Sequence, residues 1–199
     1  MSADIGLFEA MNTQRAIRYL KPDPVPEEMI AKLIEAATRA PSGTNQQGWS
    51  FIVVRDAGLR SKLGDIYQKA GRAAIPRIRY VEAVNKRLFD SAVYLVDHLG
   101  EAPVLILPCI EHSGPTGLTT GASIYPAVQN ILLAARALGL GSVLTTFHKA
   151  YEGEVKELLG LPENVETAAL LPVGFPADGV RYGPTNRQPV DQVLHWDRW

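Results

Sequence analysis

Two short apolar runs constrain the fold of this chain more than any other feature. Residues 103–110 read PVLILPCI and residues 49–54 read WSFIVV, so apolar side chains occupy both odd and even positions. Successive side chains of a β-strand point to opposite faces, and these runs therefore predict strands that are covered on both faces. We expect the strand at 49–54, which is rich in aromatic and β-branched residues, to be central in its sheet rather than at an edge.

Helices must supply that cover, and two segments have the required periodicity. In both segments apolar residues recur every three or four positions, which places them on one helical face. They are Met29, Ile30, Leu33, Ile34, Ala37 and Ala40 in residues 27–40, and Val128, Ile131, Leu132, Ala135 and Leu138 in residues 121–138. The first helix is expected to start at Pro26 and to end before Pro41 and Gly43.

The remaining elements are shorter or less regular. We expect strands at 142–147 and 167–174, a short helix at 152–159 and a basic helical region at 60–100. The sum is a layered α/β protein with about four buried strands covered by helices. Without a visible linker or repeat, residues 1–199 are expected to form one domain. The apolar tail from Phe175 to Trp199 is expected to pack on another surface, and a partner subunit is one candidate.

Composition and charge argue against several classes of protein. The chain has 20 basic and 21 acidic residues, so its net charge of −1 does not suggest a nucleic-acid or anionic-membrane surface. Cys109 is the only cysteine, which excludes an intrachain disulfide, and its apolar surroundings favour a buried structural thiol. The sequence shows no secretory signal pattern and no apolar stretch near the ~18 residues of a membrane span, so a soluble, cytoplasmic protein is expected.

Several common catalytic motifs are missing or stand in the wrong context. Residues 139–144, GLGSVL, lack the third glycine of a dinucleotide fingerprint and precede a strand instead of following one. Ser123, in GASIY, lacks the glycine that a nucleophile elbow needs two residues later. The histidines have no metal-ligand spacing, and no metal is expected. If the protein is an enzyme, a bound cofactor is expected to carry the chemistry, without a catalytic side chain.

The segment from Arg60 to Asp90 is unusually basic, with eight Lys or Arg residues and three acids. A solvated helix face would explain this composition. The alternative is a lid that attracts an anionic or phosphorylated ligand, and the sequence favours the solvated face over it.

Three groups of residues suit a planar cofactor that carries a phosphate. Arg15 and Arg18, in TQRAIRYL, share a face if that segment is helical, and Arg187 stands in TNRQP near the other end. Residues 40–49, APSGTNQQGW, offer hydroxyl and amide side chains that both donate and accept, and a glycine that lets backbone approach a flat ring. These residues are Ser42, Asn45, Gln47 and Gly43. Each group alone is ordinary, since such arginines are usually on the surface and Ser-Gly-Thr-Asn is usually a turn.

Three longer stretches occur in a characteristic order. They are TQRAIRYLKPDPVPEEMIAKLIEAATRAPSGTNQQGWSFIVVRD, then ASIYPAVQNILLAARALGLGSVLTTFH, then LLPVGFP followed by NRQPVDQVLHW. Together they resemble the opening, the central helix with the strand after it, and the C-terminal part of the nitroreductase family of flavin mononucleotide (FMN) enzymes. The resemblance covers most of the chain, and residues 57–100 are its least diagnostic part.

The resemblance implies an α+β fold with a mixed central sheet flanked by helices. It also implies a homodimer in which C-terminal arms embrace the partner and two FMN sites lie at the interface, each lined by both chains. By position, Arg15, Ala16, Arg18 and Arg187 are implied to bind the phosphate and ribityl part. The residues implied to lie near the ring are Pro41, Ser42, Gly43, Asn45 and Gln47 from one subunit and Leu144, Thr145 and Thr146, with His148 beyond them as a substrate-binding residue.

The function implied is that of an FMN-dependent oxidoreductase. It would transfer hydride from NADH or NADPH, through the flavin, to an electron-poor acceptor such as a nitroaromatic or a quinone. The alternatives are another reaction on the same fold, namely reductive dehalogenation, a dehydrogenation or flavin breakdown, and a flavin-binding module without turnover. Three departures from the family pattern concern phosphate binding: Gln14-Arg15-Ala16 replaces Arg-Arg-Ser, Gly48 replaces a proline and Thr185 replaces a basic residue.

Overall fold

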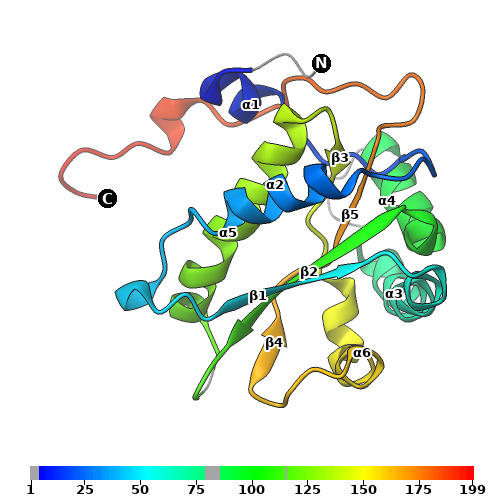
Figure 1. The fold of residues 1–199 in the computed structure, drawn as a ribbon. Coiled ribbons are helices and arrows are strands. Elements are labelled where there is room, and N and C mark those ends of the chain that lie inside the picture. Colours follow the sequence, from blue (N-terminus) through cyan, green and yellow to red (C-terminus); the bar gives the residue numbers. More distant parts are fainter. Residues whose placement is uncertain (1–4, 79–85, 115) are drawn as a thin grey trace.

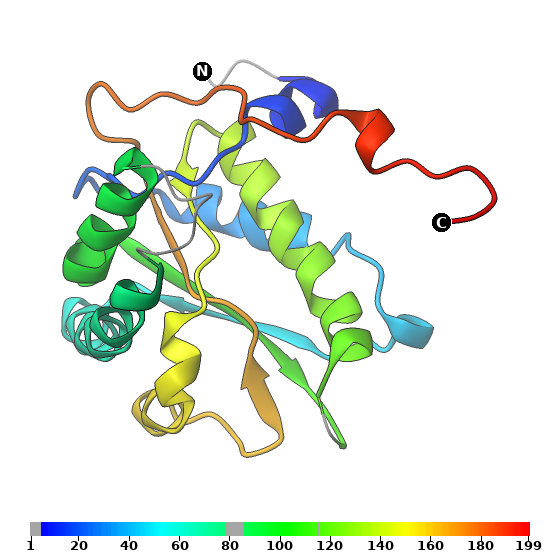
Figure 2. The same cartoon turned by 180° about the vertical axis from the view of Figure 1, so that it is seen from behind.

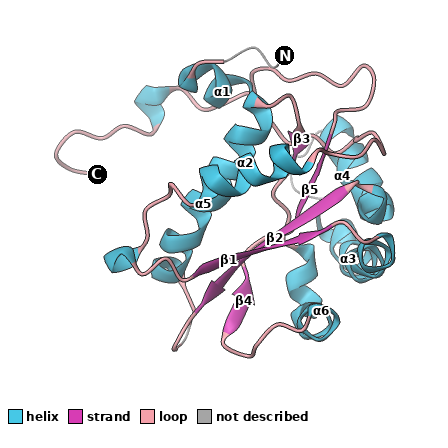
Figure 3. Cartoon of the chain, in the orientation of Figure 1, coloured by secondary structure: helices cyan, strands magenta, loops and turns pink. Residues whose placement is uncertain are grey.

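The computed structural model describes residues 5–78, 86–114 and 116–199 (Figure 1). Its α-helices are α1 (Leu7–Thr13), α2 (Glu27–Ala37), α3 (Ala57–Ile78), α4 (Lys86–His98), α5 (Leu118–Ala137) and α6 (Glu152–Leu159). Its strands are β1 (Trp49–Val54), β2 (Val104–Glu111), β3 (Gly141–Ser142), β4 (Val165–Thr167) and β5 (Leu171–Gly174). Short 3-10 helices are η1 (Gly43–Asn45), η2 (Leu99–Glu101), η3 (Phe147–Tyr151) and η4 (Val190–Gln192). The result is the expected α+β arrangement of a sheet flanked by helices (Figure 3).

The described strand pairs are all antiparallel, in the order β1-β2-β5-β3, with β4 paired to the end of β2. The mixed sheet implied by the resemblance would need a parallel pair as well. β1 lies at one end of this order, so the prediction that residues 49–54 are central is wrong. Phe51 and Val53 pack toward one core and Ile52 and Val54 toward the other. Apolar residues on both faces of a strand therefore indicate that other side chains pack above and below the sheet. Such packing does not require a neighbouring strand on each side.

β2 divides two hydrophobic cores, as the run at 103–110 predicted. Its even-numbered residues Val104, Ile106 and Ile110 belong to a core shared with α2 and α5, while its odd-numbered residues Leu105, Leu107 and Cys109 belong to a core shared with α3, α4 and α6. The two sets of helices lie on opposite faces of the sheet (Figures 1 and 2). Cys109 is confirmed as buried, and burial raises the pKa of its thiol to about 11. The thiol is therefore structural at neutral pH.

The predicted helices are confirmed with shifted ends. The segment 27–40 contains α2, which ends three residues earlier, and the segment 121–138 is α5, which starts three residues earlier. The short helix at 152–159 is α6. The region 60–100 contains α3 and α4, and residues 79–85 of the basic segment lie outside the described residues. Across the described ranges, no helix combines the length and the apolar character needed to cross a bilayer.

Basic side chains of α3 and α4 form surface ion pairs. Arg72 pairs with Asp97 at 3.1 Å and Lys86 with Asp90 at 2.6 Å. This arrangement is what a solvated helix face would show. It does not test whether the segment also acts as a lid.

The two later strands were predicted too long. The predicted strand 142–147 is strand only at Gly141–Ser142, after which the chain leaves the sheet and touches it again through a bridge between Thr145 and Leu170. The predicted strand 167–174 is likewise divided into β4 and β5. β-branched residues at these positions favour extended backbone, but a ladder also needs a partner along its whole length.

The last 25 residues run over and beyond the rest of the chain. Ala177 N donates to Tyr19 O, and the Tyr182 ring stacks on the Arg136 guanidinium at 4.2 Å. Beyond them the tail extends past α1 and away from the body (Figures 1 and 2). Large apolar side chains of the tail and α1 are exposed, namely Val190, Val193, Leu194, Trp196, Trp199, Leu7, Phe8 and Met11. The single chain therefore leaves an apolar surface without cover.

Candidate functional site

A cavity of about 270 Å³ lies where the N-terminal segment, α3, α4 and the chain after β3 meet. We call it the arginine cavity. It is lined by Arg18, Tyr67, Leu88, Ala92, Leu95, Val143, Leu144, Thr145, Thr146 and Phe147. Four of the residues predicted to bind a cofactor are thus brought together, although more than a hundred positions separate Arg18 from the others.

Arg18 is the charged residue of this cavity. Its Nη1 donates to Ser91 Oγ at 3.1 Å, and no ion pair between Arg18 and a carboxylate is found among the described residues. Burial lowers the pKa of the guanidinium, although Tyr67 and Tyr19 act in the opposite direction. A half-buried cation that faces a neutral hydroxyl is suited to an anionic or strongly accepting ligand group.

The other predicted cations lie elsewhere. Residues 14–19 are not helical, because α1 ends at Thr13, so Arg15 and Arg18 do not share a helical face. Arg15 is half-buried and Ala16 exposed, and neither lines the arginine cavity. Arg187 is exposed in the tail, where its Nη1 donates to Asn186 O at 3.0 Å.

Tyr67 is a cavity residue that the sequence analysis missed. It projects from α3, is 2% exposed, and places its hydroxyl 2.6 Å from Thr145 Oγ1. Burial raises the pKa of its phenol to about 12, with smaller opposing effects from Thr145 and Arg18. Its isolated aromatic side chain in a basic helical segment was the available signal, and that signal alone does not distinguish a cavity wall from an ordinary core position.

The Ser42 loop, residues 42–47, forms a second polar site. Gln47 N donates to Ser42 Oγ at 3.0 Å, and Gly43 N donates to Ser123 Oγ at 3.0 Å. Thr44, Asn45 and Gln47 have positive φ angles of 48°, 56° and 53°. This backbone is uncommon for residues other than glycine, so the two serine hydroxyls hold a conformation that the chain would not otherwise favour.

The polar side chains of the Ser42 loop and its neighbour Ser123 therefore fall into two sets. The hydroxyls of Ser42 and Ser123 are used inside the protein, where they fix the loop. The exposed side chains of Asn45 and Gln47 contact each other, with Gln47 Nε2 donating to Asn45 Oδ1 at 3.2 Å. Pro41 is exposed beside them, and a cavity of about 390 Å³ adjoins Ser42 and Gly43. The amides and this cavity remain accessible to a ligand.

The Ser42 loop and the arginine cavity lie at different ends of α5. The loop is tied to Ser123 near the start of that helix, whereas the cavity residues 143–147 follow its end. Helix α5 has 20 residues and is therefore about 30 Å long. Both views of the fold show η1 and β3 on opposite sides (Figures 1 and 2). A single chain thus separates the predicted residues of the Ser42 loop from those of the arginine cavity, and Arg15, Ala16 and Arg187 belong to neither.

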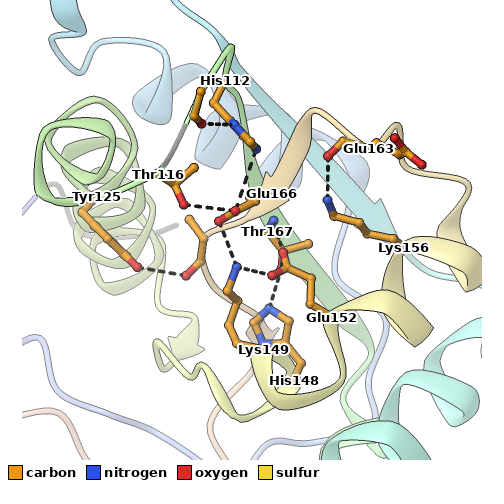
Figure 4. Close-up of polar contacts among 12 residues, drawn as sticks. His112, Thr116, Tyr125, His148, Lys149, Glu152, Lys156, Glu163, Glu166 and Thr167 are labelled. Carbon is orange, nitrogen blue, oxygen red and sulfur yellow. Dashed lines mark hydrogen bonds and ion pairs between the residues drawn. The ribbon is translucent and has the colours of Figure 1, made fainter.

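His148 lies in a buried polar network rather than at a cavity wall (Figure 4). The hydroxyl hydrogen of Thr167 is donated to Glu152 Oε1 at 3.0 Å, so Thr167 Oγ1 accepts from His148 Nε2 at 2.9 Å. Nδ1 is then an unprotonated, buried acceptor without a described partner. Burial, and next the charge of Lys149, lower the pKa of His148 to about 4.

This placement corrects the assignment of His148 to substrate binding. The side chain has no exposed surface, and it does not line the arginine cavity. Its hydrogen bond fastens η3 to β4, and Lys149 continues the network through ion pairs with Glu152 and, at 3.3 Å, with Glu166. The described residues contain no group of three or more acidic, histidine or cysteine side chains that could hold a metal ion.

The chain has clear relatives among known proteins. The sequence model of the Nitroreductase family matches residues 12–175. An NADH dehydrogenase of Thermus thermophilus is 31% identical, with 98% of this chain and all of that protein covered. Iodotyrosine deiodinase 1 of Rattus norvegicus is 29% identical over 94% of this chain and 68% of that protein.

A solved structure agrees with these sequence matches. It is an oxidized iodotyrosine deiodinase bound to FMN and 3-iodo-L-tyrosine, and it superposes with a TM-score of 0.79 at 27% identity. The match covers 98% of this chain and 100% of that one. The α+β fold of the family, implied by the sequence motifs, is therefore confirmed, whereas the exchange of C-terminal arms stays a prediction.

Proposed function

Because this chain belongs to the nitroreductase family, we propose that it is an FMN-dependent oxidoreductase that carries electrons from NADH or NADPH to an electron-poor acceptor. Nitroaromatics and quinones are the acceptor classes proposed. The cytoplasmic location and the single domain expected from the sequence stay predictions.

The observation that carries the proposal is the placement of Arg18 beside Thr145 and Thr146 in one cavity. The guanidinium and the two hydroxyls supply donors to a ligand that is rich in acceptors, as a phosphate-bearing flavin is. When bound, FMN supplies the hydride and electron transfer chemistry. Leu95 and Phe147 form apolar walls, and the lower polarity beside them strengthens the action of the donors on charge that develops in the cavity.

We further propose that the complete site needs a second copy of the chain. The Ser42 loop is tied to the first third of α5, whereas cavity residues 143–147 follow the end of that helix, so the loop would line the site of the partner. The exposed apolar residues of α1 and the tail supply a surface that such a partner would cover. Arg187, carried on this tail, would then reach the phosphate, and Arg15 would assist from the N-terminal segment. This assignment gives the predicted residues outside the arginine cavity a common role.

The first experiment is the absorbance spectrum of the purified protein, before and after incubation with FMN and removal of the excess. Bound flavin bands are expected, followed by steady NADH or NADPH oxidation when a nitroaromatic or quinone is added. A protein without flavin bands after incubation would refute the proposal. Flavin bands without any turnover would instead indicate a flavin-binding module.

A mixing experiment tests the shared site. Arg18→Ala removes the cation of the cavity, and Gly43→Trp places a bulky side chain in the Ser42 loop, so each variant alone should bind little FMN. A mixed dimer of the two variants has one site with neither change, and it should regain half of the wild-type FMN content. A mixture that binds no more FMN than the separate variants would contradict a site built from two chains.

Reductive dehalogenation is a second candidate, favoured by a specific observation. The superposed structure is that of an iodotyrosine deiodinase with 3-iodo-L-tyrosine bound, at 27% identity to this chain. Release of iodide from 3-iodo-L-tyrosine by the reduced protein, at a rate exceeding that of nitroaromatic reduction, would favour the dehalogenase. The reverse ranking supports the oxidoreductase proposed above.

A further inference from the structure

Two hydroxyl groups meet at the wall of the arginine cavity. Tyr67 OH, from α3, lies 2.6 Å from Thr145 Oγ1, and both residues line the cavity together with Arg18. Thr145 is itself held in place, because its backbone N–H and C=O both pair with Leu170. The contact therefore joins a buried phenol to a hydroxyl whose backbone position is fixed.

The direction of this hydrogen bond follows from burial. Tyr67 is 2% exposed, so a phenol hydrogen that did not donate to Thr145 Oγ1 would lose its described partner in a buried position. Thr145 is only half-buried, and its own hydrogen has an outlet into the cavity. Burial raises the pKa of Tyr67 to about 12, which keeps the phenol protonated at neutral pH. Either hydroxyl can donate, and the deeper burial of Tyr67 favours Tyr67 as the donor and Thr145 as the acceptor.

We propose that Tyr67 is a positioning residue that donates to Thr145 Oγ1 and thereby turns the Thr145 hydroxyl hydrogen into the arginine cavity, toward an acceptor atom of the flavin. The inference rests on the proposed function, since it takes FMN as the occupant of the cavity. Reduced flavin carries negative charge, so a donor aimed at its ring stabilises the reduced form more than the oxidised form. Consecutive hydrogen bonds polarise one another, and the Tyr67 bond therefore strengthens this donor.

A tyrosine that only packs would occupy the same place. Its ring lies 5.5 Å from the ring of Phe147, a contact that contributes to the core without the hydroxyl. Tyr67→Phe separates the two roles, because it keeps the ring and removes one oxygen atom. If Tyr67 only packs, Tyr67→Phe leaves the reduction potential of bound FMN unchanged. If Tyr67 positions Thr145, the substitution lowers that potential, because reduced FMN loses part of its stabilisation.

The test measures the midpoint potential of bound FMN, by equilibration with a reference dye, and the dissociation constant of oxidised FMN. The variants are Tyr67→Phe, Thr145→Val, Thr145→Ser and the double variant of the first two. Thr145→Val should change the ratio of affinities for reduced and oxidised FMN by about tenfold, which is about 30 mV for a two-electron couple. Tyr67→Phe should give a smaller shift in the same direction, and Thr145→Ser should stay near wild type.

The double variant decides whether Tyr67 acts through Thr145. Its potential should equal that of Thr145→Val alone, because without the threonine hydroxyl the phenol has nothing to direct. A wild-type potential in Tyr67→Phe, or single shifts that add in the double variant, would overturn the proposal. Tyr182→Phe is the matched control, since the Tyr182 hydroxyl is buried but does not line the cavity. Its potential should not change.

Two safeguards keep the outcome clear. If Tyr67→Phe does not fold, Thr145→Val and Thr145→Ser decide, because equal potentials in these two variants would show that the hydroxyl has no role. A wild-type protein that takes up no FMN would refute the proposed function itself. Failure of the positioning role is therefore distinguishable, since it appears only in a protein that does bind FMN.

Discussion

The buried histidine predicts an acid-sensitive fold. His148 has an ordinary pKa of 6.5 in an unfolded chain and a pKa of about 4 in the folded protein, because burial and the charge of Lys149 disfavour its protonated form. Between these values the unfolded chain binds more protons than the folded one, so the free energy of unfolding falls as the pH falls. One pKa unit corresponds to about 1.4 kcal/mol, and lowering the pH from 7 to 5 should therefore cost about 2 kcal/mol.

The choice of pH 5 isolates His148 from its neighbour Glu152. Burial opposes ionisation of Glu152, but hydrogen bonds from Lys149 and Thr167 outweigh it and hold the pKa of the carboxyl below its usual 4.5. A lowered carboxyl pKa gives stability that is present above 4.5 and lost as the pH falls further. At pH 5 most of the Glu152 contribution remains, so the loss of stability between pH 7 and pH 5 comes mainly from His148.

The assay is urea unfolding followed by circular dichroism at pH 7, 6 and 5, with a fixed concentration of protein and saturating FMN. His148→Gln is the matched variant, because its amide can still donate to Thr167 but cannot take up a proton. Wild type should lose about 2 kcal/mol more than this variant between pH 7 and pH 5. Equal losses in the two proteins would refute the reasoning, since the other histidines are common to both.

Three further predictions concern separate parts of the molecule. Arg187→Ala should weaken FMN binding by about tenfold or more, because a charged hydrogen-bond partner is lost. Arg181→Ala, also in the exposed tail, should leave the affinity unchanged. Equal affinities of the two variants in equilibrium titrations would remove Arg187 from the site. Ser123→Ala removes the acceptor of a loop amide, so FMN affinity should fall several-fold with little change in melting temperature; unchanged affinity would separate this tie from binding. Gly141→Ala would place Cβ 2.6 Å from an isoleucine side chain and should lower the free energy of unfolding by about 1–3 kcal/mol. Gly153→Ala has open space around Cβ and should not lower it. Urea unfolding of both variants measures the difference.

The sequence predicted best where one physical rule decides the structure. The helical face of residues 27–40 needs only the 3.6-residue period, and Ile30, Leu33 and Ala37 are buried as expected. The two-faced burial of β2 follows from the alternation of side chains along a strand. The edge position of β1 does not follow from either rule. Its apolar pattern indicates that both faces of the strand are buried, but it contains no information on how many strands pair with it.

The site was predicted in part for the same reason. The family motifs indicated Arg18 and Thr145, and the fold places them in one cavity. Tyr67 and Ser123 could not be found in this way, since their roles depend on contacts with residues 78 and 80 positions away. For His148, sequence position next to the cavity residues was misleading, because η3 turns its side chain into the interior.

The length of α5 bears on the proposal that the site is built from two chains. The Ser42 loop is anchored to Ser123 near one end of this helix, and residues 143–146 follow the other end. The helix is packed into the core along Ile124, Val128, Ile131 and Ala135, so its length of about 30 Å is fixed. From Ser123 to the end of α5 at Ala137 the rise along the axis is about 21 Å, so a small shift of the loop does not bring it to residues at the other end of the helix. This separation supports the proposal that a second chain brings its loop to the first chain's arginine cavity, and the mixing experiment, rather than any single substitution, tests it.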